Sequence, residues 1–318
     1  MRTRTLGKSG IELTTVGLGT WAIGGGDWKF GWGPQDDREA IDAVVKAVEV
    51  GVNWIDTAAV YGDGQSEVLV GRALKELGSL PRPLVATKCS RVVQPDGNVV
   101  GDLSRANVFR EVEDSLKRLD IDVIDLYQVH WPKPPEDIEE AWGAMAELVQ
   151  QGKVRHIGVS NFNVEQMRRI QPIHPITSLQ PPYSMIVRGV EDEILTFCAN
   201  EGIGVVSYSP MYKGLLTGAF DAKRISTLGK GDHRLNDPNF LPPKFEQHLS
   251  LVEGLRPIAE RNGRTLAQLS VAWVLRHSAV TSAIVGARRP DQIVATAPAG
   301  DWELSDADIA EIDALLQV

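Results

Sequence analysis

The chain has 318 residues, which is enough for one large domain or two of ordinary size. Its formal net charge of −9 excludes the basic face that nucleic-acid binding requires, so we expect no nucleic-acid partner. Two cysteines, Cys89 and Cys198, lie far apart and form no CxxC pair, which argues against a disulfide framework and against a zinc site.

The amino terminus has no apolar segment behind its positive charges, and a run of about 18 apolar residues occurs nowhere. We therefore expect a soluble, cytoplasmic protein with a small-molecule substrate and no membrane partner. Nothing in the sequence indicates the oligomeric state.

In chain order, short apolar runs alternate with loops and amphipathic stretches. One such stretch, Val108-Val112-Leu116-Leu119, places apolar residues at steps of three and four, which is typical of a helix. Strands that alternate with helices predict a parallel sheet, and eight units of about 30 residues predict an α/β fold, the (β/α)8 TIM barrel. The eight predicted strands are Val16 to Gly19, Val52 to Asp56, Leu84 to Lys88, Val123 to His130, Val154 to Ser160, Ser178 to Gln180, Ile203 to Ser209 and Thr281 to Gly286.

Three additions to the simple barrel are predicted. Thr3 to Leu13 should form an N-terminal β-hairpin that turns at Gly7-Lys8-Ser9-Gly10. A loop insertion after strand 7 is placed at Met211 to Pro243, because this stretch is rich in Gly, Pro, Asp and Asn and shows no period. A C-terminal helix should begin at Ser305, which caps it. Because no linker divides the chain, we expect a single domain over residues 1–318.

A rival architecture is the doubly wound dinucleotide-binding fold. Gly17-Leu18-Gly19-Thr20-Trp21-Ala22 matches the GxGxxA pattern directly after a predicted strand. In the dinucleotide-binding fold this glycine pattern must stand at the start of a helix. A helix is disfavoured here by the residues that follow, Gly24-Gly25-Gly26 and Gly31-Trp32-Gly33-Pro34. We therefore interpret these glycines as a loop at a strand end.

Polar residues close three consecutive predicted strands. Asp56 ends strand 2, Lys88 ends strand 3 and His130 ends strand 4, while Tyr61 follows in the loop after Asp56. In a barrel of this kind, the loops at the carboxyl ends of the strands build the active site. We therefore expect these four side chains to meet at one mouth of the barrel.

Together the four residues form a group that could act as a general acid and donate a proton. A nearby ammonium, Lys88, would favour the phenolate of Tyr61 and lower its pKa, and Asp56 would hold that lysine charged and in place. A neutral His130 would hydrogen-bond a carbonyl oxygen and orient it toward Tyr61. Such a group protonates an oxygen while another agent reduces the carbon.

Taken singly, each residue has a simpler explanation. Asp56 could cap a helix, Lys88 could be a solvated charge, His130 a core histidine and Tyr61 a packing residue. Charged residues rarely end strands that are buried on both faces, so three on consecutive strands favour a shared site.

Several spaced motifs, in order, make the sequence similar to the aldo-keto reductases over essentially its whole length. They are Asn53-Trp54-Ile55-Asp56-Thr57-Ala58-Ala59-Val60-Tyr61-Gly62, Ala86-Thr87-Lys88, Asp125-Leu126-Tyr127-Gln128-Val129-His130-Trp131-Pro132, Ile157-Gly158-Val159-Ser160-Asn161 and Ser207-Tyr208-Ser209-Pro210. The resemblance implies a (β/α)8 barrel, NADP-dependent and reversible reduction of aldehydes or ketones, and a catalytic tetrad of Asp56, Tyr61, Lys88 and His130. The Gly-Leu-Leu-Thr-Gly loop at 214–218 resembles the bacterial and plant branches.

The resemblance also implies where NADP(H) binds. It places the nicotinamide carboxamide against Ser160, Asn161 and Gln180 and stacks the ring on Tyr208, in agreement with the chemistry of an amide and a flat ring. The guanidinium of Arg288 is expected to bind the 2′-phosphate, so we expect NADP(H) rather than NAD(H) as the cofactor. The full expected set is Gly19, Thr20, Trp21, Asp56, Ser160, Asn161, Gln180, Tyr208, Ser209, Pro210, Lys213, Leu216, Gly218, Gly286, Arg288 and Gln292.

Within this set, the backbone amides of Leu216 and Gly218 would meet the pyrophosphate, and Lys213 could add a charge. The sequence departs from the family pattern at one position. Many relatives place an asparagine four residues after Gln292 to contact adenine, whereas this chain has Thr296. The sequence therefore does not identify the residue that would contact adenine.

Eight tryptophans stand against seven phenylalanines and five tyrosines. Trp54, Trp142 and Trp273 lie in predicted strands or helices and should belong to the core. Four others fall in loops that leave strands 1 and 4 and should contact the substrate. The expected substrate-binding residues are Trp21, Trp28, Trp32, Tyr61, His130 and Trp131. Sugars, small aldehydes and larger ketones remain open as substrates, as does the preferred direction.

Three other function classes compete. Barrels of this family also occur as potassium-channel β-subunits, which would make the chain a cofactor-binding regulatory subunit, but the tetrad is complete and the sequence offers no long partner-binding extension. A Schiff-base lyase could use Lys88, although Asp56 would keep that lysine protonated and poorly nucleophilic. A metal-dependent hydrolase would need clustered ligands, whereas the six histidines form no HxH or HExxH.

Overall fold

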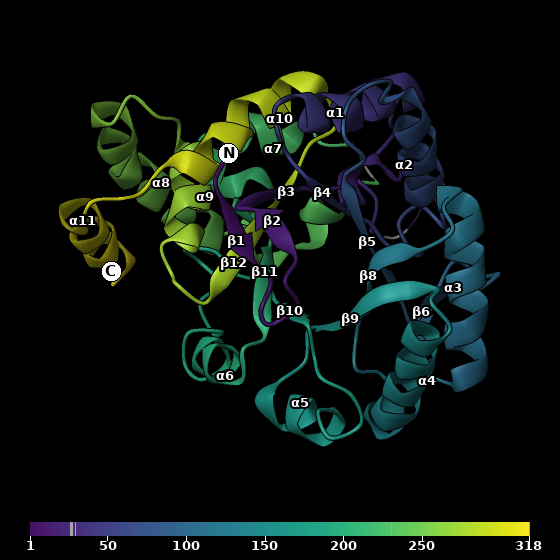
Figure 1. Cartoon of the computed structure of the whole chain (residues 1–318). Helices are drawn as coiled ribbons and strands as arrows, with labels where there is room; N and C mark the ends of the chain where they lie inside the picture. Colours follow the sequence, from purple (N-terminus) through teal and green to yellow (C-terminus); the bar gives the residue numbers. More distant parts are fainter. Residues whose placement is uncertain (26–27, 29, 230, 318) are drawn as a thin grey trace.

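Eight parallel strands close into a barrel in this computed structural model, which describes residues 1–25, 28, 30–229 and 231–317 (Figure 1). The strands pair in chain order, and the last one closes on the first. They are β3 (Val16–Gly19), β4 (Trp54–Asp56), β5 (Leu84–Cys89), β8 (Ile124–Val129), β9 (Val154–Ser160), β10 (Ser178–Gln180), β11 (Gly204–Tyr208) and β12 (Val280–Gly286). The predicted (β/α)8 barrel is confirmed. Gly26, part of the glycine run that argued against a helix after β3, lies outside the described residues.

Helices surround the barrel and bury their apolar stripes against it (Figure 1). In the helix predicted around Val108, the side chains of Val108, Val112 and Leu119 are fully buried. The described helices are α1 (Asp37–Glu49), α2 (Gln65–Glu76), α3 (Arg105–Leu119), α4 (Ile138–Gln150), α5 (Val164–Ile170), α6 (Ile194–Glu201), α7 (Ala222–Ser226), α8 (Lys244–Arg261), α9 (Leu266–Leu275), α10 (Pro290–Thr296) and α11 (Asp306–Leu316). None of the helices in the described part of the chain combines the length and the apolar character that a membrane crossing needs.

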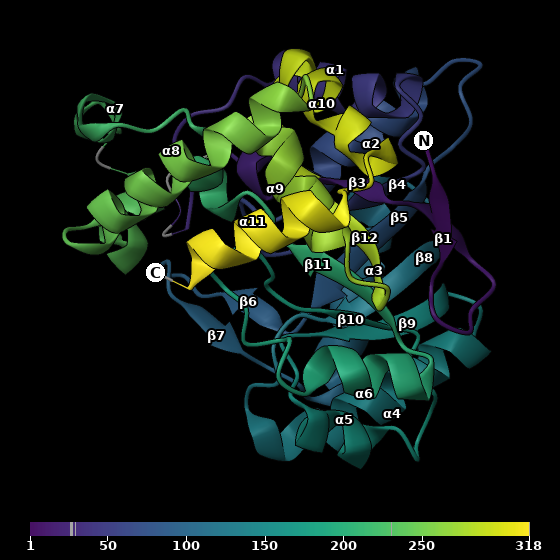
Figure 2. The ribbon, with the colours of Figure 1, turned by 90° about the vertical axis from the view of Figure 1, so that its left-hand side faces the viewer.

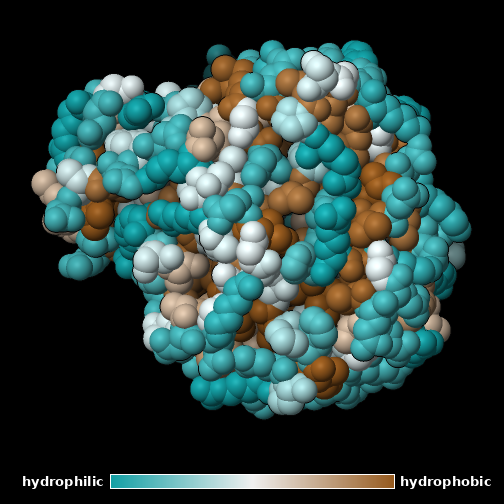
Figure 3. Space-filling view, in the orientation of Figure 1, coloured by the Kyte–Doolittle hydropathy of each residue, from teal (hydrophilic) through white to brown (hydrophobic). Residues whose placement is uncertain are grey.

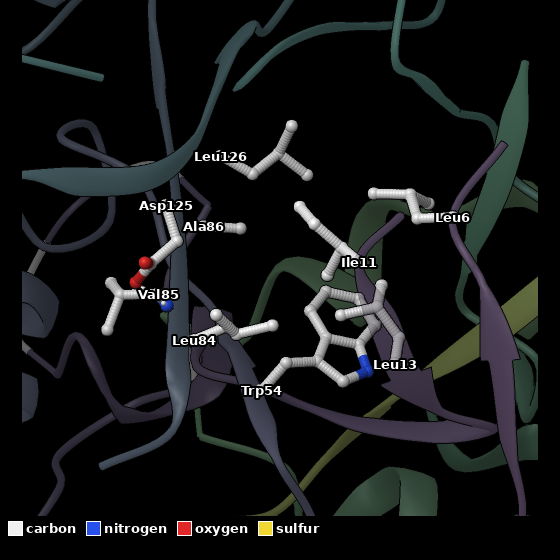
Figure 4. A pocket seen from close by; sticks show the side chains of 9 residues that line it. All are labelled: Leu6, Ile11, Leu13, Trp54, Leu84, Val85, Ala86, Asp125 and Leu126. Atoms are coloured by element: carbon white, nitrogen blue, oxygen red, sulfur yellow. Dashed lines mark hydrogen bonds between the residues drawn. The ribbon is translucent and has the colours of Figure 1, made fainter. Parts of the chain in front are cut away.

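The predicted N-terminal hairpin is confirmed and closes one end of the barrel. Its strands, β1 (Thr3–Thr5) and β2 (Glu12–Thr14), pair antiparallel and lie at the right-hand side of Figure 2. Figure 4 shows the apolar plug beneath it, where side chains from the hairpin point at side chains from the barrel floor, while Val85 and Asp125 lie on the other side of their strands. The facing residues are Leu6, Ile11, Leu13, Trp54, Leu84, Ala86 and Leu126.

This plug leaves no room for a substrate. The void inside it measures about 10 Å³, which holds at most one water molecule. The space-filling view in the same orientation as Figure 1 shows several hydrophobic areas interspersed with hydrophilic residues (Figure 3). The strands have their carboxyl ends at the opposite end of the barrel, called the mouth below, where barrels of this kind carry their active sites.

A second hairpin lies near the mouth and was not predicted. Its strands, β6 (Arg91–Val93) and β7 (Val99–Gly101), follow β5 and lie at the side of the molecule away from β1 (Figure 2). It packs closely on the segment after β8, because a Cβ added to Gly101 would come within 2.2 Å of the Lys133 carbonyl oxygen. Between the two strands, Pro95-Asp96-Gly97 is a recognisable turn signal.

The insertion after β11 is where predicted, but it is not an irregular loop. It consists of short helical turns at Tyr212–Thr217, His233–Asn236 and Pro238–Phe240, together with α7. The turns fold because they share a small apolar core of Leu215, Phe220, Phe240 and Phe245. Four apolar residues spread over about 30 positions give no helical or strand period, which is why these turns are not visible in the sequence.

The C-terminal helix and the buried tryptophans agree with prediction. The side chain of Ser305 accepts a hydrogen bond from the Asp308 amide and caps α11. The side chains of Trp54, Trp142 and Trp273 are buried in the core.

Candidate active site

Asp56, Lys88 and His130 lie at the mouth because β4, β5 and β8 are neighbours and run parallel. Asp56 is the last residue of β4, Lys88 is the last but one of β5, and His130 directly follows β8. Tyr61 lies in the loop between β4 and α2. The structure thus brings together the four residues that were predicted to form one site.

Lys88 is the centre of this group. The residue is 1% exposed, and its ammonium donates to Asp56 Oδ2 at 2.7 Å, to the Thr57 carbonyl at 2.8 Å and to the Tyr61 hydroxyl at 3.4 Å. These three partners use its three N–H groups. The hydroxyl of Tyr61 is therefore held beside a buried ion pair.

The pKa of Tyr61 differs from the sequence-based expectation. Burial, followed by the charge of Asp56, raises the pKa of Tyr61 well above its ordinary value, whereas Lys88 was expected to lower it. That prediction is wrong for the protein alone, because Asp56 neutralises the ammonium at 2.7 Å while burial acts on the phenol. Burial also lowers the pKa of Lys88, and the charge and hydrogen bond of Asp56 oppose this. At neutral pH the tyrosine consequently holds its proton.

His130 has the neutral ring that was predicted. Burial lowers the pKa of His130 well below its usual value, and the charges of Lys88 and Arg91 act in the same direction. Its ring lies edge-on to the ring of Tyr61, with 5.7 Å between their centroids. In the described part of the chain its buried Nδ1 has no hydrogen-bond partner. A hydrogen-bonding group is therefore available beside the Tyr61 ring.

Aromatic rings extend the site outward. Trp21 and Trp28 each lie 6.5 Å from the ring of Tyr61, and Trp32 lies edge-on to Trp21 at 5.3 Å. The fourth tryptophan expected here, Trp131, follows His130 but is 36% exposed. Three of the four tryptophans thus cluster with Tyr61, and a substrate contact of Trp131 stays a prediction.

The residues expected to hold the nicotinamide amide form a hydrogen-bonded set at the ends of β9, β10 and β11. Asn161 Nδ2 donates to the His130 carbonyl and to Ser160 Oγ, both at 3.0 Å, and Asn161 Oδ1 accepts from the Tyr208 hydroxyl at 2.8 Å. Gln180 Nε2 donates to Asp56 Oδ1 at 2.8 Å, which links this set to the buried ion pair.

This set fits a nicotinamide cofactor. It offers amide donors and acceptors together with the aromatic ring of Tyr208, as a carboxamide on a flat ring requires. At the end of β12, a Cβ added to Gly286 would meet nothing within 4 Å, so there is open space beside this strand end. Gly19 pairs with Gly286 in the barrel register, and Thr20 donates from its hydroxyl to the Asp56 carbonyl at 3.0 Å beneath the site.

The loop expected to meet the pyrophosphate begins with strained backbone. Ser209, which precedes Pro210, has a φ of 58°, and Lys213 has a φ of 55°, both in the left-handed region. Lys213 Nζ pairs with Asp237 Oδ2 at 2.7 Å. The amide of Leu216, expected to bind phosphate, donates to the Met211 carbonyl at 3.2 Å within the loop, while Gly218 ends the turn with a φ of 74°.

Arg288 does not point freely into solvent. Its guanidinium donates to Gln35 Oε1 at 2.6 Å, to the Trp32 carbonyl at 3.1 Å and to the Pro34 carbonyl. Burial lowers the pKa of Arg288. A phosphate at this arginine would thus replace contacts to the loop between β3 and α1.

The residues around Arg288 have structural roles. Gln292 Oε1 accepts from the amide of Arg288 at 2.7 Å and caps α10. Arg289 pairs with Asp291 on the surface, as expected for an arginine at a helix start. The hydroxyl of Thr296 is turned back onto the Gln292 carbonyl at 2.9 Å, so it is not directed at a ligand.

Sequence reasoning missed one residue of the mouth. His233, from the insertion, lies 4.8 Å from the ring of Trp21 and 4.8 Å from the ring of Trp32, and its Nδ1 bonds the Gly31 carbonyl at 3.0 Å. Next to it, the Arg234 guanidinium stacks over Trp32 at 4.6 Å. The contact between His233 and Gly31 spans about 200 residues of chain, so no local pattern predicts it. The only local feature of His233 is its polar, glycine-rich sequence setting.

The fold and the residues at its mouth define a (β/α)8-barrel oxidoreductase. Residues 15–317 match the Aldo/keto reductase family, and the chain belongs to that family. Members of this family interconvert carbonyls and alcohols with nicotinamide cofactors.

Three relatives cover nearly the whole chain. It is 39% identical over 318 residues to Aldo-keto reductase YhdN of Bacillus subtilis (strain 168), which covers 100% of this chain and 94% of that protein. It is 37% identical to an NADH-specific methylglyoxal reductase of Escherichia coli (strain K12), covering 97% of this chain and 96% of that protein. Among solved structures, a glycerol dehydrogenase from Gluconobacter oxydans matches with a TM-score of 0.89 and 37% identity, covering 99% of this chain and 94% of that one.

Proposed function

We propose that this protein reduces an aldehyde or ketone to an alcohol, reversibly and with a preference for NADP(H), and that Tyr61 donates the proton. The observation that carries the proposal is the position of Lys88, whose ammonium contacts Asp56 Oδ2 at 2.7 Å and the Tyr61 hydroxyl at 3.4 Å. A buried ion pair beside a phenol stabilises negative charge on the phenol oxygen when its proton leaves.

A reduced nicotinamide held beside this group would supply the hydride for the carbonyl carbon. Tyr61 gives its proton to the carbonyl oxygen, and Lys88 stabilises the tyrosinate that remains. A proton from solvent then restores the neutral Tyr61 hydroxyl. Asp56 keeps Lys88 charged and in place. His130 hydrogen-bonds the carbonyl oxygen and orients it toward Tyr61. In the reverse direction the tyrosinate accepts the proton of an alcohol.

The cofactor would be held by the residues that surround this group. Ser160, Asn161 and Gln180 would hold the carboxamide, and Tyr208 would pack against the ring. Backbone groups of the 209–218 loop would meet the pyrophosphate. To bind the 2′-phosphate, Arg288 would give up its acceptors in the loop between β3 and α1. The proposed preference for NADP(H) rests on the planar, charged guanidinium that Arg288 offers to a phosphate.

The cofactor preference has its own test. Arg288→Ala should raise the Kd of NADPH about 100-fold and that of NADH no more than about threefold, because only NADPH carries the 2′-phosphate. Quenching of tryptophan fluorescence by the cofactor measures both constants. Arg289→Ala is the matched control, because Arg289 is paired with Asp291 on the surface. An equal loss for both cofactors, or a wild type that binds NADH more tightly, would refute the preference, and the E. coli relative is named NADH-specific.

The activity is tested by following oxidation of NADPH and of NADH with a panel of aldehydes, ketones and sugars, with Tyr61→Phe as the blank. Turnover by the wild type with at least one small carbonyl is the expected result. A protein that binds the cofactor tightly but reduces none of them would instead be a regulatory, cofactor-binding barrel.

A further inference from the structure

Arg91, the first residue of β6, is a partly buried arginine without a partner. Among the residues that the structure describes, none forms a hydrogen bond, an ion pair or a ring contact with its guanidinium. Every other partly buried arginine of this part of the chain has such a contact, and these are Arg2, Arg4, Arg118, Arg188, Arg234, Arg256, Arg264, Arg276 and Arg288. A charged group with five N–H donors is thus left without an acceptor in a place partly removed from water.

The hairpin of β6 and β7 (Figure 2) holds Arg91 beside the residues proposed to be catalytic. Two residues before Arg91, the Cys89 carbonyl accepts from the His130 amide at 3.1 Å. Arg91 pairs in register with Gly101, where an added Cβ would come within 2.2 Å of the Lys133 carbonyl oxygen. The hairpin is therefore packed on the segment that follows His130. Burial lowers the pKa of His130 most, and the charge of Arg91 adds to this, so the two side chains are close enough to interact.

The carboxyl groups around this hairpin have other partners. Burial raises the pKa of Glu111, behind β5, to about 7, and the cation that opposes this shift is Arg110 rather than Arg91. Asp96 and Asp102 each accept hydrogen bonds from the residue two positions further along the chain. None of these carboxyls neutralises Arg91, so its charge is available to a ligand.

The other cations at the mouth differ from Arg91. Four of them are bound by carboxylates or by acceptors of the loop between β3 and α1, and they are Lys88, Lys213, Arg234 and Arg288. Lys133 has no ion pair with a described residue, but it is exposed and its ammonium lies over the ring of Trp131 at 5.7 Å. Arg91 alone combines partial burial, a position beside His130 and a guanidinium without a partner in the described chain.

We propose that Arg91 binds a carboxylate of the substrate, so that the substrate class is an oxo acid, an aldehyde or ketone that carries a carboxylate, and the product is the corresponding hydroxy acid. This inference rests on the proposed carbonyl reduction. The hydride and the proton go to the carbonyl group as described above, and the carboxylate takes no part in their transfer. A guanidinium pairs with a carboxylate through two parallel hydrogen bonds, and such a pair is stronger where water is partly excluded. The net charge of −9 repels anions in general, so a local cation without a partner is what would select one.

Two pairs of substrates test this inference. They are 4-oxobutanoate and 5-oxopentanoate, each compared with its methyl ester, which keeps the chain and removes the charge. The two chain lengths place the carboxylate at different distances from the reacting carbonyl. For at least one of them, we expect kcat/KM of the acid to exceed that of its ester by about 30-fold or more, mainly through KM.

Arg91→Met removes the charge and keeps an unbranched side chain. It should lower kcat/KM for the preferred acid about 30-fold and change that for the ester no more than about twofold. Arg91→Lys keeps the charge but loses the two-point contact, and should lower the value for the acid only about fivefold. Both variants should keep the Tm of the wild type within about 2 °C, because Arg91 has no partner in the described chain to lose.

Lys133→Met is the matched control. It removes another charge without an ion pair in the described chain, from an exposed residue of the segment on which the hairpin packs. If the acid is bound by direct contact with Arg91 and not by the general field of the mouth, this variant should change kcat/KM for the acid no more than about twofold.

The outcomes distinguish this inference from the proposed function. A wild type that reduces no carbonyl compound at all would overturn the proposed function and this inference with it. A wild type that reduces carbonyls but does not prefer either acid to its ester would leave carbonyl reduction in place and overturn the binding of a carboxylate by Arg91. The same conclusion would follow if Arg91→Met lowered the values for acid and ester by the same factor, or if Lys133→Met lowered the value for the acid as much as Arg91→Met.

Discussion

Glu111 is a buried carboxyl whose protonation affects the stability of the fold. It lies on α3, it is 7% exposed, and its Oε2 accepts from the Ser90 amide and from Asn107 Nδ2, both at 2.7 Å. Burial raises the pKa of Glu111 from 4.5 to about 7, although the two hydrogen bonds oppose the shift. Glu111→Gln removes the titration and keeps the shape of the side chain.

The sign of the effect follows from where each state titrates. Below pH 4.5 the carboxyl is protonated in both the folded and the unfolded chain and has no influence. Between pH 4.5 and about 7 the unfolded chain loses this proton while the folded chain keeps it, so stability falls as the pH rises. Above about pH 7 the loss of stability stays constant. The difference between the two pKa values, 4.5 and about 7, corresponds to about 3 kcal/mol.

Denaturant unfolding, followed by circular dichroism across this pH range, measures the effect. The free energy of unfolding of Glu111→Gln minus that of the wild type should rise by about 3 kcal/mol between about pH 4.5 and pH 7.5. Glu165→Gln, on the exposed side of α5, is the control and should show no such rise. If the difference for Glu111→Gln is the same at both pH values, the assignment of a buried, protonated carboxyl is refuted.

Two further predictions concern the ion pair and the tyrosine. Lys88→Met should destabilise the fold by about 3–5 kcal/mol, because it leaves Asp56 buried without its partner, whereas the double variant with Asp56→Asn should regain most of that loss without regaining turnover. Thermal melts measure this, and a double variant as unstable as Lys88→Met would contradict it. Alcohol oxidation should accelerate as the pH rises while carbonyl reduction should not, because oxidation needs the tyrosinate and burial raises the pKa of Tyr61. Profiles of kcat/KM against pH in both directions decide this, and oxidation that is independent of pH would count against Tyr61.

The barrel and the centre of its site were predictable because their signals are local. Each buried strand is an apolar run, and Asp56, Lys88 and His130 interrupt the pattern at the ends of three such runs. Neighbouring parallel strands must end on the same side, so the positions of these residues along the chain already imply that they meet.

The parts that could not be predicted depend on contacts between distant segments. His233 reaches Gly31 and the tryptophans of the β3 to α1 loop across about 200 residues, and no local pattern announces this. The pKa of Tyr61 depends on how deeply the mouth buries it and on how closely Asp56 holds Lys88, which are distances that a sequence does not contain. The hairpin of β6 and β7 differs from these, because Pro95-Asp96-Gly97 is a local turn signal for it.

The most direct test of the central claim is the turnover of Tyr61→Phe. Removing the hydroxyl takes away the proposed proton donor but keeps the ring, so kcat for carbonyl reduction should fall about 1,000-fold while the Kd of NADPH changes no more than about threefold. Tyr183→Phe removes another buried tyrosine hydroxyl, one that contacts Glu191 and Arg276, and should retain turnover. A Tyr61→Phe enzyme that turns over at close to the wild-type rate would contradict the account.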